Sequence, residues 1–85
     1  MSPSAKSTSH RIQEAIARAL GMRGPAPTMP LAMGSTPGWD SMGHMNVVLE
    51  LEKEFGVRFE PYRLPDLVDV GSITKTLKEY GVEGS

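Results

Sequence analysis

The sequence predicts an all-α domain, a small four-helix bundle with three main helices, a short third helix and a long loop between the first two. Apolar residues recur at helical spacing in three segments, each preceded by a capping residue and followed by a glycine. No segment alternates strongly enough to build a sheet. The 85 residues suffice for one domain with a small core.

The first main helix is expected from about His10 to Leu20, after a flexible tail at residues 1–8. Ser9 can cap it, because a short side-chain oxygen accepts hydrogen bonds from the free N–H groups of a first turn. Gly21 is expected to end this helix. The buried face is expected to hold Ile12, Ile16, Ala19 and Leu20.

Residues 22–38 contain four prolines and three glycines, so we expect no regular element there. The segment is nevertheless too apolar for a free linker. We expect an ordered loop that lays its apolar side chains across the core. These side chains are Met29, Leu31, Ala32, Met33 and the following Trp39.

The longest helix is expected from Ser41 to Phe55, ending at Gly56. A rotation of about 100° per residue separates two apolar stripes on it. The core-facing stripe comprises His44, Val47, Val48, Leu51 and Phe55. The other comprises Met42, Met45 and Leu49. Two interpretations of this second stripe remain open: another element covers it, or it is an exposed surface that docks a partner.

Pro61 can begin a short third helix, which Pro65 is expected to limit to about one turn. Asp69 then caps the last helix, and Gly81 ends it. The single helical domain therefore spans residues 9–81, with a frayed end at residues 82–85. The inward side chains of this half are expected to be Leu64, Leu67, Val68, Val70, Ile73, Leu77 and Tyr80.

Composition excludes several classes of function. The formal net charge of -1 offers no basic surface for nucleic acid or an anionic membrane. The absence of Cys and the presence of only two His argue against a metal site. No apolar run is long enough for a membrane span or a signal peptide, so we expect a soluble, cytoplasmic protein, and a monomer. A core this small leaves little room for a catalytic cleft, so we do not expect an enzyme.

The start of the second main helix has one capping residue more than it needs. Asp40 and Ser41 can both cap, and a spare hydroxyl at the positive end of a helix can carry a phosphate. A Ser41–His44 hydrolase is the catalytic alternative, since residues three apart are neighbours on a helix. No acidic residue is placed to orient His44, which lies on the apolar face. We therefore expect Ser41 to be an acceptor, and Asp40 to cap the helix or contact the modifying enzyme.

The run Asp40-Ser41-Met42 resembles the Asp-Ser-Leu signature of acyl carrier proteins, with Met in place of Leu. The resemblance continues through residues 48–56, Val-Leu-Glu-Leu-Glu-Lys-Glu-Phe-Gly. It extends without a gap to residues 69–73, Asp-Val-Gly-Ser-Ile. It therefore covers the last three helices of the expected bundle.

This resemblance implies that Ser41, next to Asp40, is the attachment site of 4'-phosphopantetheine, donated from coenzyme A by a separate Mg-dependent phosphopantetheinyl transferase. The arm would carry acyl intermediates as thioesters from a loading ligase or acyltransferase to synthase enzymes of fatty acid, polyketide or related biosynthesis. Partner enzymes would contact Met42, Met45, Leu49, Glu50, Glu52 and Lys53. The core and any acyl cavity would be lined by Val47, Val48, Leu51, Phe55, Leu67, Val70, Ile73 and Leu77.

The chain departs from typical fatty acid carriers in four ways. Its net charge is mild, and Lys53 interrupts the acidic stretch. Its loop reads Ser35-Thr36-Pro37-Gly38-Trp39 in place of Phe-x-x-Asp-Leu-Gly, and Pro65 shortens the third helix. These differences favour a specialised stand-alone carrier.

The alternative to a carrier is a helical protein-interaction module. It would use the Met42, Met45 and Leu49 stripe to bind its partner, and Ser41 would be only a helix cap.

Overall fold

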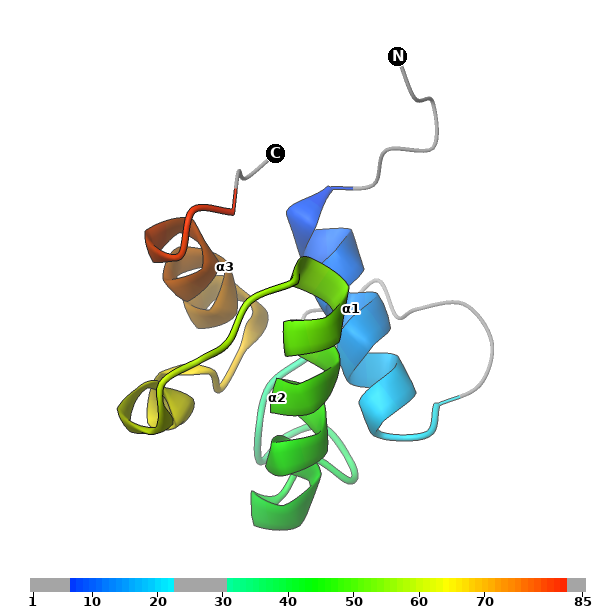
Figure 1. Ribbon diagram of the computed structural model, residues 1–85. Coiled ribbons are helices and arrows are strands. Elements are labelled where there is room, and N and C mark those ends of the chain that lie inside the picture. The colour runs from blue at the N-terminus through cyan, green and yellow to red at the C-terminus, as the bar shows by residue number, and fades with distance from the viewer. Residues whose placement is uncertain (1–6, 23–30, 83–85) are drawn as a thin grey trace.

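A computed structural model describes residues 7–22 and 31–82 of the chain. The all-helical class is confirmed over these residues, which contain no strand and one isolated antiparallel bridge, between Ala32 and Asp69 (Figure 1). The elements in chain order are α1 at Thr8–Ala19, α2 at Ser41–Phe55, the 3₁₀ helix η1 at Pro61–Asp66 and α3 at Val70–Glu79.

The start of α1 differs from the prediction. The helix begins at Thr8 and is capped by Ser7, whose hydroxyl oxygen accepts from the His10 N–H at 3.1 Å. The expected cap at Ser9 is therefore wrong, and Thr8 belongs to the helix rather than to the tail. Ser7, Thr8 and Ser9 can all cap a helix, but Thr8 is buried and so favours the earlier start. Residues 1–6 of the expected tail lie outside the described residues.

The bounds predicted for α2 are confirmed. Asp40 caps its start, and Gly56 follows its end in the left-handed conformation, at φ 66°. The Gly56 N–H donates to the Glu52 carbonyl at 2.9 Å. Helix α2 runs antiparallel to α1 (Figure 1), so the start of α1 lies beside the end of α2.

The 3₁₀ helix η1 is longer than the single turn expected. It contains Pro65, whose missing N–H removes only one hydrogen bond. The turns before and after Pro65 remain hydrogen-bonded. The Arg63 N–H donates to the Glu60 carbonyl at 2.8 Å, and the Leu67 N–H donates to the Leu64 carbonyl at 3.1 Å. Of the side chains expected to point inward here, Leu67 is fully buried, whereas Leu64 and Val68 are half-buried.

Helix α3 begins with a capping box. The Asp69 carboxylate accepts from the Ser72 N–H at 2.7 Å, and the Ser72 hydroxyl oxygen accepts from the Asp69 N–H at 3.2 Å. After Gly81 the chain turns back, so that the Val82 N–H donates to the Leu77 carbonyl at 2.9 Å. Val82 packs against the core and is not frayed, whereas residues 83–85 lie outside the described residues.

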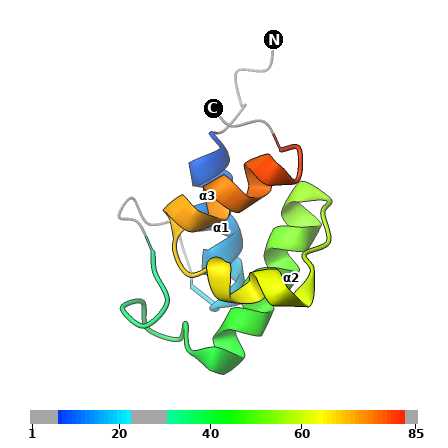
Figure 2. The same cartoon turned by 90° about the vertical axis from the view of Figure 1, so that its left-hand side faces the viewer.

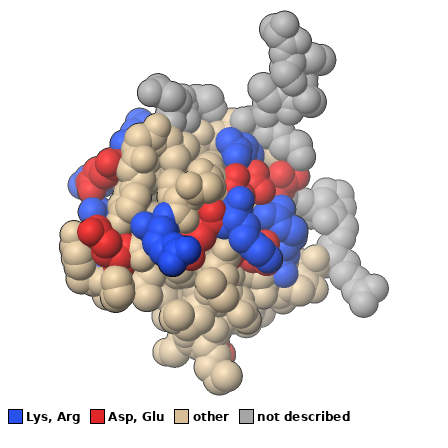
Figure 3. Space-filling model, viewed as in Figure 1, with Lys and Arg blue, Asp and Glu red and all other residues tan. Residues whose placement is uncertain are grey.

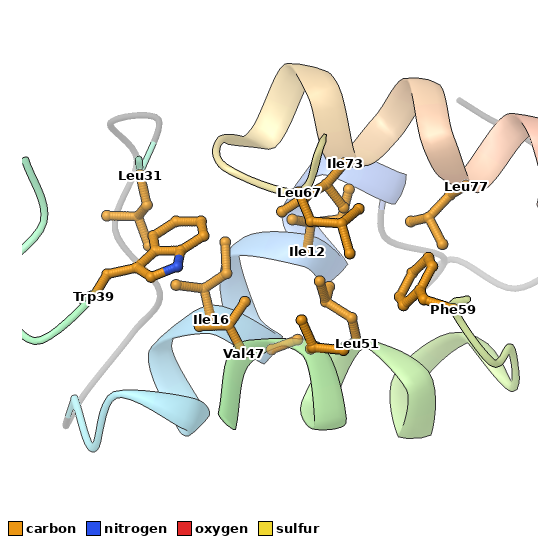
Figure 4. Packing of buried hydrophobic residues seen from close by; sticks show 12 residues of the cluster. Ile12, Ile16, Leu31, Trp39, Val47, Leu51, Phe59, Leu67, Ile73 and Leu77 are labelled. Atoms are coloured by element: carbon orange, nitrogen blue, oxygen red, sulfur yellow. The ribbon is translucent and has the colours of Figure 1, made fainter. Parts of the chain in front are cut away.

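Helix α3 packs on α1, and η1 lies between α3 and α2 (Figure 2). Side chains from all three α-helices and from the loop before α2 meet in one core, where they point toward one another (Figure 4). Six of the eight predicted core residues are buried; the other two, Phe55 and Val70, are half-buried and pack against the rest. The fully or nearly buried core residues comprise Ile12, Ala15, Ile16, Leu31, Trp39, Val47, Val48, Leu51, Phe59, Leu67, Ile73 and Leu77.

The described part of the long loop lies across the core as expected, with Leu31 and Trp39 buried; Met29 falls outside the described residues. Two hydrogen bonds hold the loop to the bundle. Gln13 on α1 accepts from the Leu31 N–H at 3.0 Å, and the Met33 N–H donates to the Val68 carbonyl at 2.8 Å. The loop is thus tied to α1 and to the entry of α3 before it reaches α2.

Over the described ranges, none of the helices is both long and apolar enough to cross a membrane.

Candidate functional site

Ser41 is the first residue of α2 and is exposed. The capping role falls to Asp40, as expected: its Oδ1 accepts from the Gly43 N–H at 2.9 Å, and its carbonyl accepts from the His44 N–H at 2.8 Å. The Ser41 hydroxyl makes no hydrogen bond to any residue in the described part of the chain. It is therefore not needed for the cap and is exposed at the positive end of the helix.

Trp39 and His44 hold this helix start against the bundle. The Trp39 Nε1–H donates to the His44 Nδ1 at 2.9 Å, and the His44 Nε2 lies 2.9 Å from the Leu64 carbonyl oxygen. Because an indole N–H can only donate, Nδ1 must be the unprotonated nitrogen and Nε2–H the donor to Leu64. The His44 imidazole thus links the loop, α2 and η1.

The same contacts bear on the Ser41–His44 hydrolase alternative. His44 is 8% exposed, and each of its ring nitrogens already has a partner. Neither nitrogen is available to take a proton from Ser41, so this arrangement lacks the base that a nucleophilic serine requires.

A close backbone approach fixes the loop beside the first turn of α2. A Cβ atom on Gly43 would collide with the carbonyl oxygen of Gly38, which itself has a φ of 87°. The apolar periodicity of the sequence did not indicate this contact. The available signal was a glycine in the first turn of a helix, where glycine is disfavoured unless packing requires it.

An open hollow of about 460 Å³ lies next to Ser41. Its wall is formed by the consecutive residues 33–41, so Ser41 is one of the lining residues. Within the wall, the Trp39 N–H donates to the Thr36 carbonyl at 3.0 Å, so the wall has its own internal hydrogen bonding. A group attached to Ser41 has room on this side of the helix.

The second apolar stripe of α2 is exposed, so no described element covers it, contrary to the first of the two interpretations left open by the sequence. Met42, Met45 and Leu49 are 83%, 50% and 53% exposed, and no described residue covers them. In Figure 3, charged side chains gather in a band across the middle of the molecule, and the surface below it, over the start of α2, is almost free of charge. The role of the stripe in partner binding stays a prediction.

Two glutamates of α2 pair with arginines of α1. Glu54 lies 2.8 Å from Arg11 Nε and 3.0 Å from Arg18 Nη2, and Glu50 lies 3.2 Å from Arg18 Nε. Burial raises the pKa of the Glu54 carboxyl, but the hydrogen bonds and charges of Arg11 and Arg18 outweigh it and hold this pKa below its ordinary value. Arg11 also lies over the Phe55 ring, 4.4 Å from its centroid. These contacts join the two helices.

Glu52 and Lys53 differ in their surroundings. The Glu52 Oε2 accepts from the Phe59 N–H at 2.8 Å and so holds the chain that follows α2. Lys53 is exposed, with its Nζ 3.5 Å from a Glu50 oxygen. Of the predicted partner contacts, Glu50 and Glu52 thus have intramolecular partners, while the structure places Met42, Met45, Leu49 and Lys53 on one exposed side of α2.

Arg63 forms a second polar cluster, which the sequence pattern did not indicate. It lies 3.2 Å from Asp66 within η1 and 2.8 Å from Glu79 at the end of α3. The hydrogen bond to Glu79 raises the pKa of the Arg63 guanidinium above the ordinary value for arginine. This cluster ties η1 to α3 and lies apart from Ser41 in the chain.

No group of three or more His, Cys, Asp or Glu that could hold a metal ion occurs in residues 7–22 and 31–82. Comparison of the chain with protein-family models, curated proteins and solved structures finds no significant match.

Proposed function

We propose that the chain is an acyl carrier protein and that Ser41 carries 4'-phosphopantetheine. The observation that carries the proposal is the free, exposed hydroxyl of Ser41 at the start of α2, where Asp40 alone provides the cap. The resemblance of residues 40–42, 48–56 and 69–73 to acyl carrier proteins supports it. The order of the helices, with a long loop before α2 and a short η1 before α3, agrees with a bundle of the acyl-carrier type.

The surroundings of Ser41 fit the attached group. The first N–H groups of a helix lack intrahelical partners and favour an anion such as a phosphodiester. The Asp40 carboxylate opposes that charge, but one of its oxygens already accepts from Gly43. The hollow beside Ser41 leaves space for an extended arm.

Attachment is a phosphoryl-type transfer from coenzyme A catalysed by a separate enzyme. The Ser41 Oγ forms a bond to the phosphorus next to the pantetheine. The bond from that phosphorus to adenosine 3',5'-bisphosphate breaks, and the hydroxyl proton passes to a base of the transferase. The Ser41 oxygen needs no base from this chain, which agrees with the engagement of both His44 nitrogens.

The attached arm supplies a terminal thiol on which an acyl group is held as a thioester. The contribution of this chain is to hold Ser41 at an exposed point. The mild net charge and the loop at residues 35–39 favour a specialised carrier of polyketide or related biosynthesis over the general fatty acid carrier. We expect this carrier to be cytoplasmic and monomeric.

Intact mass tests the proposal. After incubation with a broad-range phosphopantetheinyl transferase, coenzyme A and Mg²⁺, we expect the mass of one phosphopantetheine to be added. Ser41→Ala should abolish the gain. Ser35→Ala is the matched control, because Ser35 is an exposed serine of the adjoining loop and should leave the gain intact. An unchanged mass for the natural sequence, or a gain that persists in Ser41→Ala, would contradict the proposal.

A helical protein-interaction module is the second candidate. The exposure of Met42, Met45 and Leu49 favours it as much as it favours a carrier. The two differ in their dependence on Ser41. A simple interaction module would bind its partner equally well with Ser41→Ala and would gain no mass in the transferase experiment.

A further inference from the structure

Resting on the proposed function, we infer that the acyl group held on the arm stays outside the helical core, and that His44 is the residue that closes the core to it. The cargo is accordingly a short or polar acyl group that lies in the hollow beside Ser41, and not a long alkyl chain.

For a group attached to Ser41, the core begins at His44. This residue stands three positions after Ser41 and is the first member of the core-facing stripe of α2, ahead of Val47 and Leu51. A chain that runs from Ser41 into the core along α2 must therefore pass His44. Three parts of the fold surround this first turn: the loop, η1 and the end of α1.

His44 closes the gaps toward two of these parts. Its Nδ1 accepts from the Trp39 Nε1–H at 2.9 Å, and its Nε2 lies 2.9 Å from the Leu64 carbonyl oxygen. The rings of Trp39 and His44 also stack, with their centroids 6.1 Å apart, and both side chains are buried. An alkyl chain that passed between α2 and either the loop or η1 would break a buried hydrogen bond. The freed polar groups would then face a chain that cannot bond to them, which is unfavourable.

A backbone contact closes the third gap, toward α1. A Cβ atom on Gly43 would collide with the Gly38 carbonyl oxygen and would lie 3.2 Å from a methyl carbon of Leu20, the residue that follows α1. This side of the first turn therefore has no room for a chain. Further along α2, Val47 and Leu51 are fully buried and point into the packed core (Figure 4).

The hollow of about 460 Å³ formed by residues 33–41 offers the alternative place for the cargo. Ser41 itself lines it, and its other lining residues include the apolar Met33 and Pro37 and the polar Ser35 and Thr36. Because the hollow is open, it covers only part of an acyl group, and each methylene group left in water is unfavourable. A short acyl group, or one with polar groups of its own, suits this place better than a long alkyl chain.

Methyl NMR of the acyl-loaded protein tests the inference. A transferase supplied with acetyl- or octanoyl-coenzyme A in place of coenzyme A attaches the corresponding acyl arm to Ser41. We expect the methyl chemical shifts of Val47, Leu51 and Leu67 to be the same in the two loaded forms of the natural sequence, because the octanoyl chain does not reach these buried side chains.

A variant with an open core should behave differently. His44→Ala removes both hydrogen bonds and most of the imidazole volume, so we expect the octanoyl chain, but not the acetyl group, to shift the core methyl signals. His10→Ala is the matched control, because His10 is the other histidine of the chain and is exposed on α1, and it should behave as the natural sequence does. Circular dichroism verifies that each variant is folded.

The reactivity of the thioester is an independent measurement. Its rate of cleavage by hydroxylamine is compared with that of the same acyl-coenzyme A. A thioester that is sequestered in most molecules reacts only through the exposed minority. We expect the relative rates of the acetyl and octanoyl forms of the natural sequence to agree within about twofold, and that of octanoyl-loaded His44→Ala to fall about threefold or more.

Core methyl shifts that respond to the octanoyl chain in the natural sequence would overturn the inference. So would a folded His44→Ala protein in which the octanoyl chain still leaves these shifts unchanged. The comparison of the two loaded forms of the natural sequence decides the inference even if His44→Ala fails to fold. These outcomes leave Ser41 loaded, whereas no loading from coenzyme A or from either acyl-coenzyme A overturns the proposed function as well.

Discussion

The Trp39 Nε1–H donates to the His44 Nδ1 at 2.9 Å, and this bond joins the last turn of the loop to the first turn of α2. The residues between these two include Ser41. On the opposite side of the imidazole, Nε2 bonds to the carbonyl of Leu64 in η1. The position of Ser41 is therefore set by a buried polar link across three parts of the fold.

The tautomer of His44 is the most direct consequence. Because Trp39 can only donate, we expect the lone pair that accepts its hydrogen bond on Nδ1 and the proton on Nε2. Nitrogen-15 NMR of the imidazole distinguishes the two nitrogens by their chemical shifts. A spectrum with Nδ1 protonated would contradict the hydrogen bond from Trp39.

The strength of the same link is accessible by a double-mutant cycle. Trp39→Phe leaves the His44 Nδ1 buried without a donor, which should cost about 1–3 kcal/mol in addition to the lost packing. In His44→Phe, the indole N–H of Trp39 loses its hydrogen-bond acceptor. Chemical denaturation of both single variants and the double variant should give a coupling of about 0.5–3 kcal/mol. Additive effects would show that the bond contributes nothing.

Two glycines in helical first turns should respond in opposite ways to alanine. Gly43→Ala places a Cβ against the Gly38 carbonyl, so we expect it to lower the free energy of unfolding by about 1–3 kcal/mol. At Gly71 in α3 the nearest atom, an oxygen of Asp69, would lie 3.6 Å from the Cβ, which is an ordinary contact. Gly71→Ala should therefore raise stability by up to about 1 kcal/mol. Equal effects in urea unfolding would contradict the close approach at Gly43.

The Asp69 cap predicts a loss of stability in acid. Hydrogen bonds from the backbone N–H and the hydroxyl of Ser72 hold the pKa of the Asp69 carboxyl below its ordinary value of 3.8. As the pH falls, the unfolded state therefore takes up the proton first. The stabilisation is complete above about pH 5 and is lost below about pH 4, as the pH passes through the lowered pKa.

Asp69→Asn isolates this contribution, because asparagine also caps a helix but does not titrate. We expect the stability difference between the natural sequence and the variant, measured by urea unfolding, to shrink as the pH is lowered from about 7 to about 3. A difference that stays constant over this range would show that Asp69 has the same pKa in both states.

The features that the sequence predicted are those set by local signals. The bounds of α2 were predicted because a capping residue, Asp40, and a glycine, Gly56, stand directly at its two ends. The start of α1 was missed because three adjacent residues can each cap, and the burial of Thr8, a tertiary effect, chooses between them. The extent of η1 was missed because Pro65 breaks an α-helix more severely than a 3₁₀ turn.

The residues of the candidate site also fall into those that local signals predicted and those that depend on tertiary contacts. Asp40 and Ser41 were predicted from their own chemistry at a helix start. The pairing of Glu50 and Glu54 was not, because Arg11 and Arg18 reach them only once α1 and α2 lie antiparallel. The link from Trp39 to His44 likewise depends on how the loop folds back on α2, which periodicity does not describe.

The two stripes of α2 give the final prediction, since they carry residues of similar size in opposite surroundings. Leu51 is fully buried, and Leu51→Ala should lower the free energy of unfolding by about 2–5 kcal/mol through lost burial and the cavity left behind. For a domain of this size that is a large share of the total. Met45 is half exposed, so Met45→Glu should change stability by no more than about 0.5 kcal/mol. Thermal and urea unfolding compare the two directly. If Met45→Glu unfolds the domain, the exposed stripe is part of the core, and its docking role is lost with it.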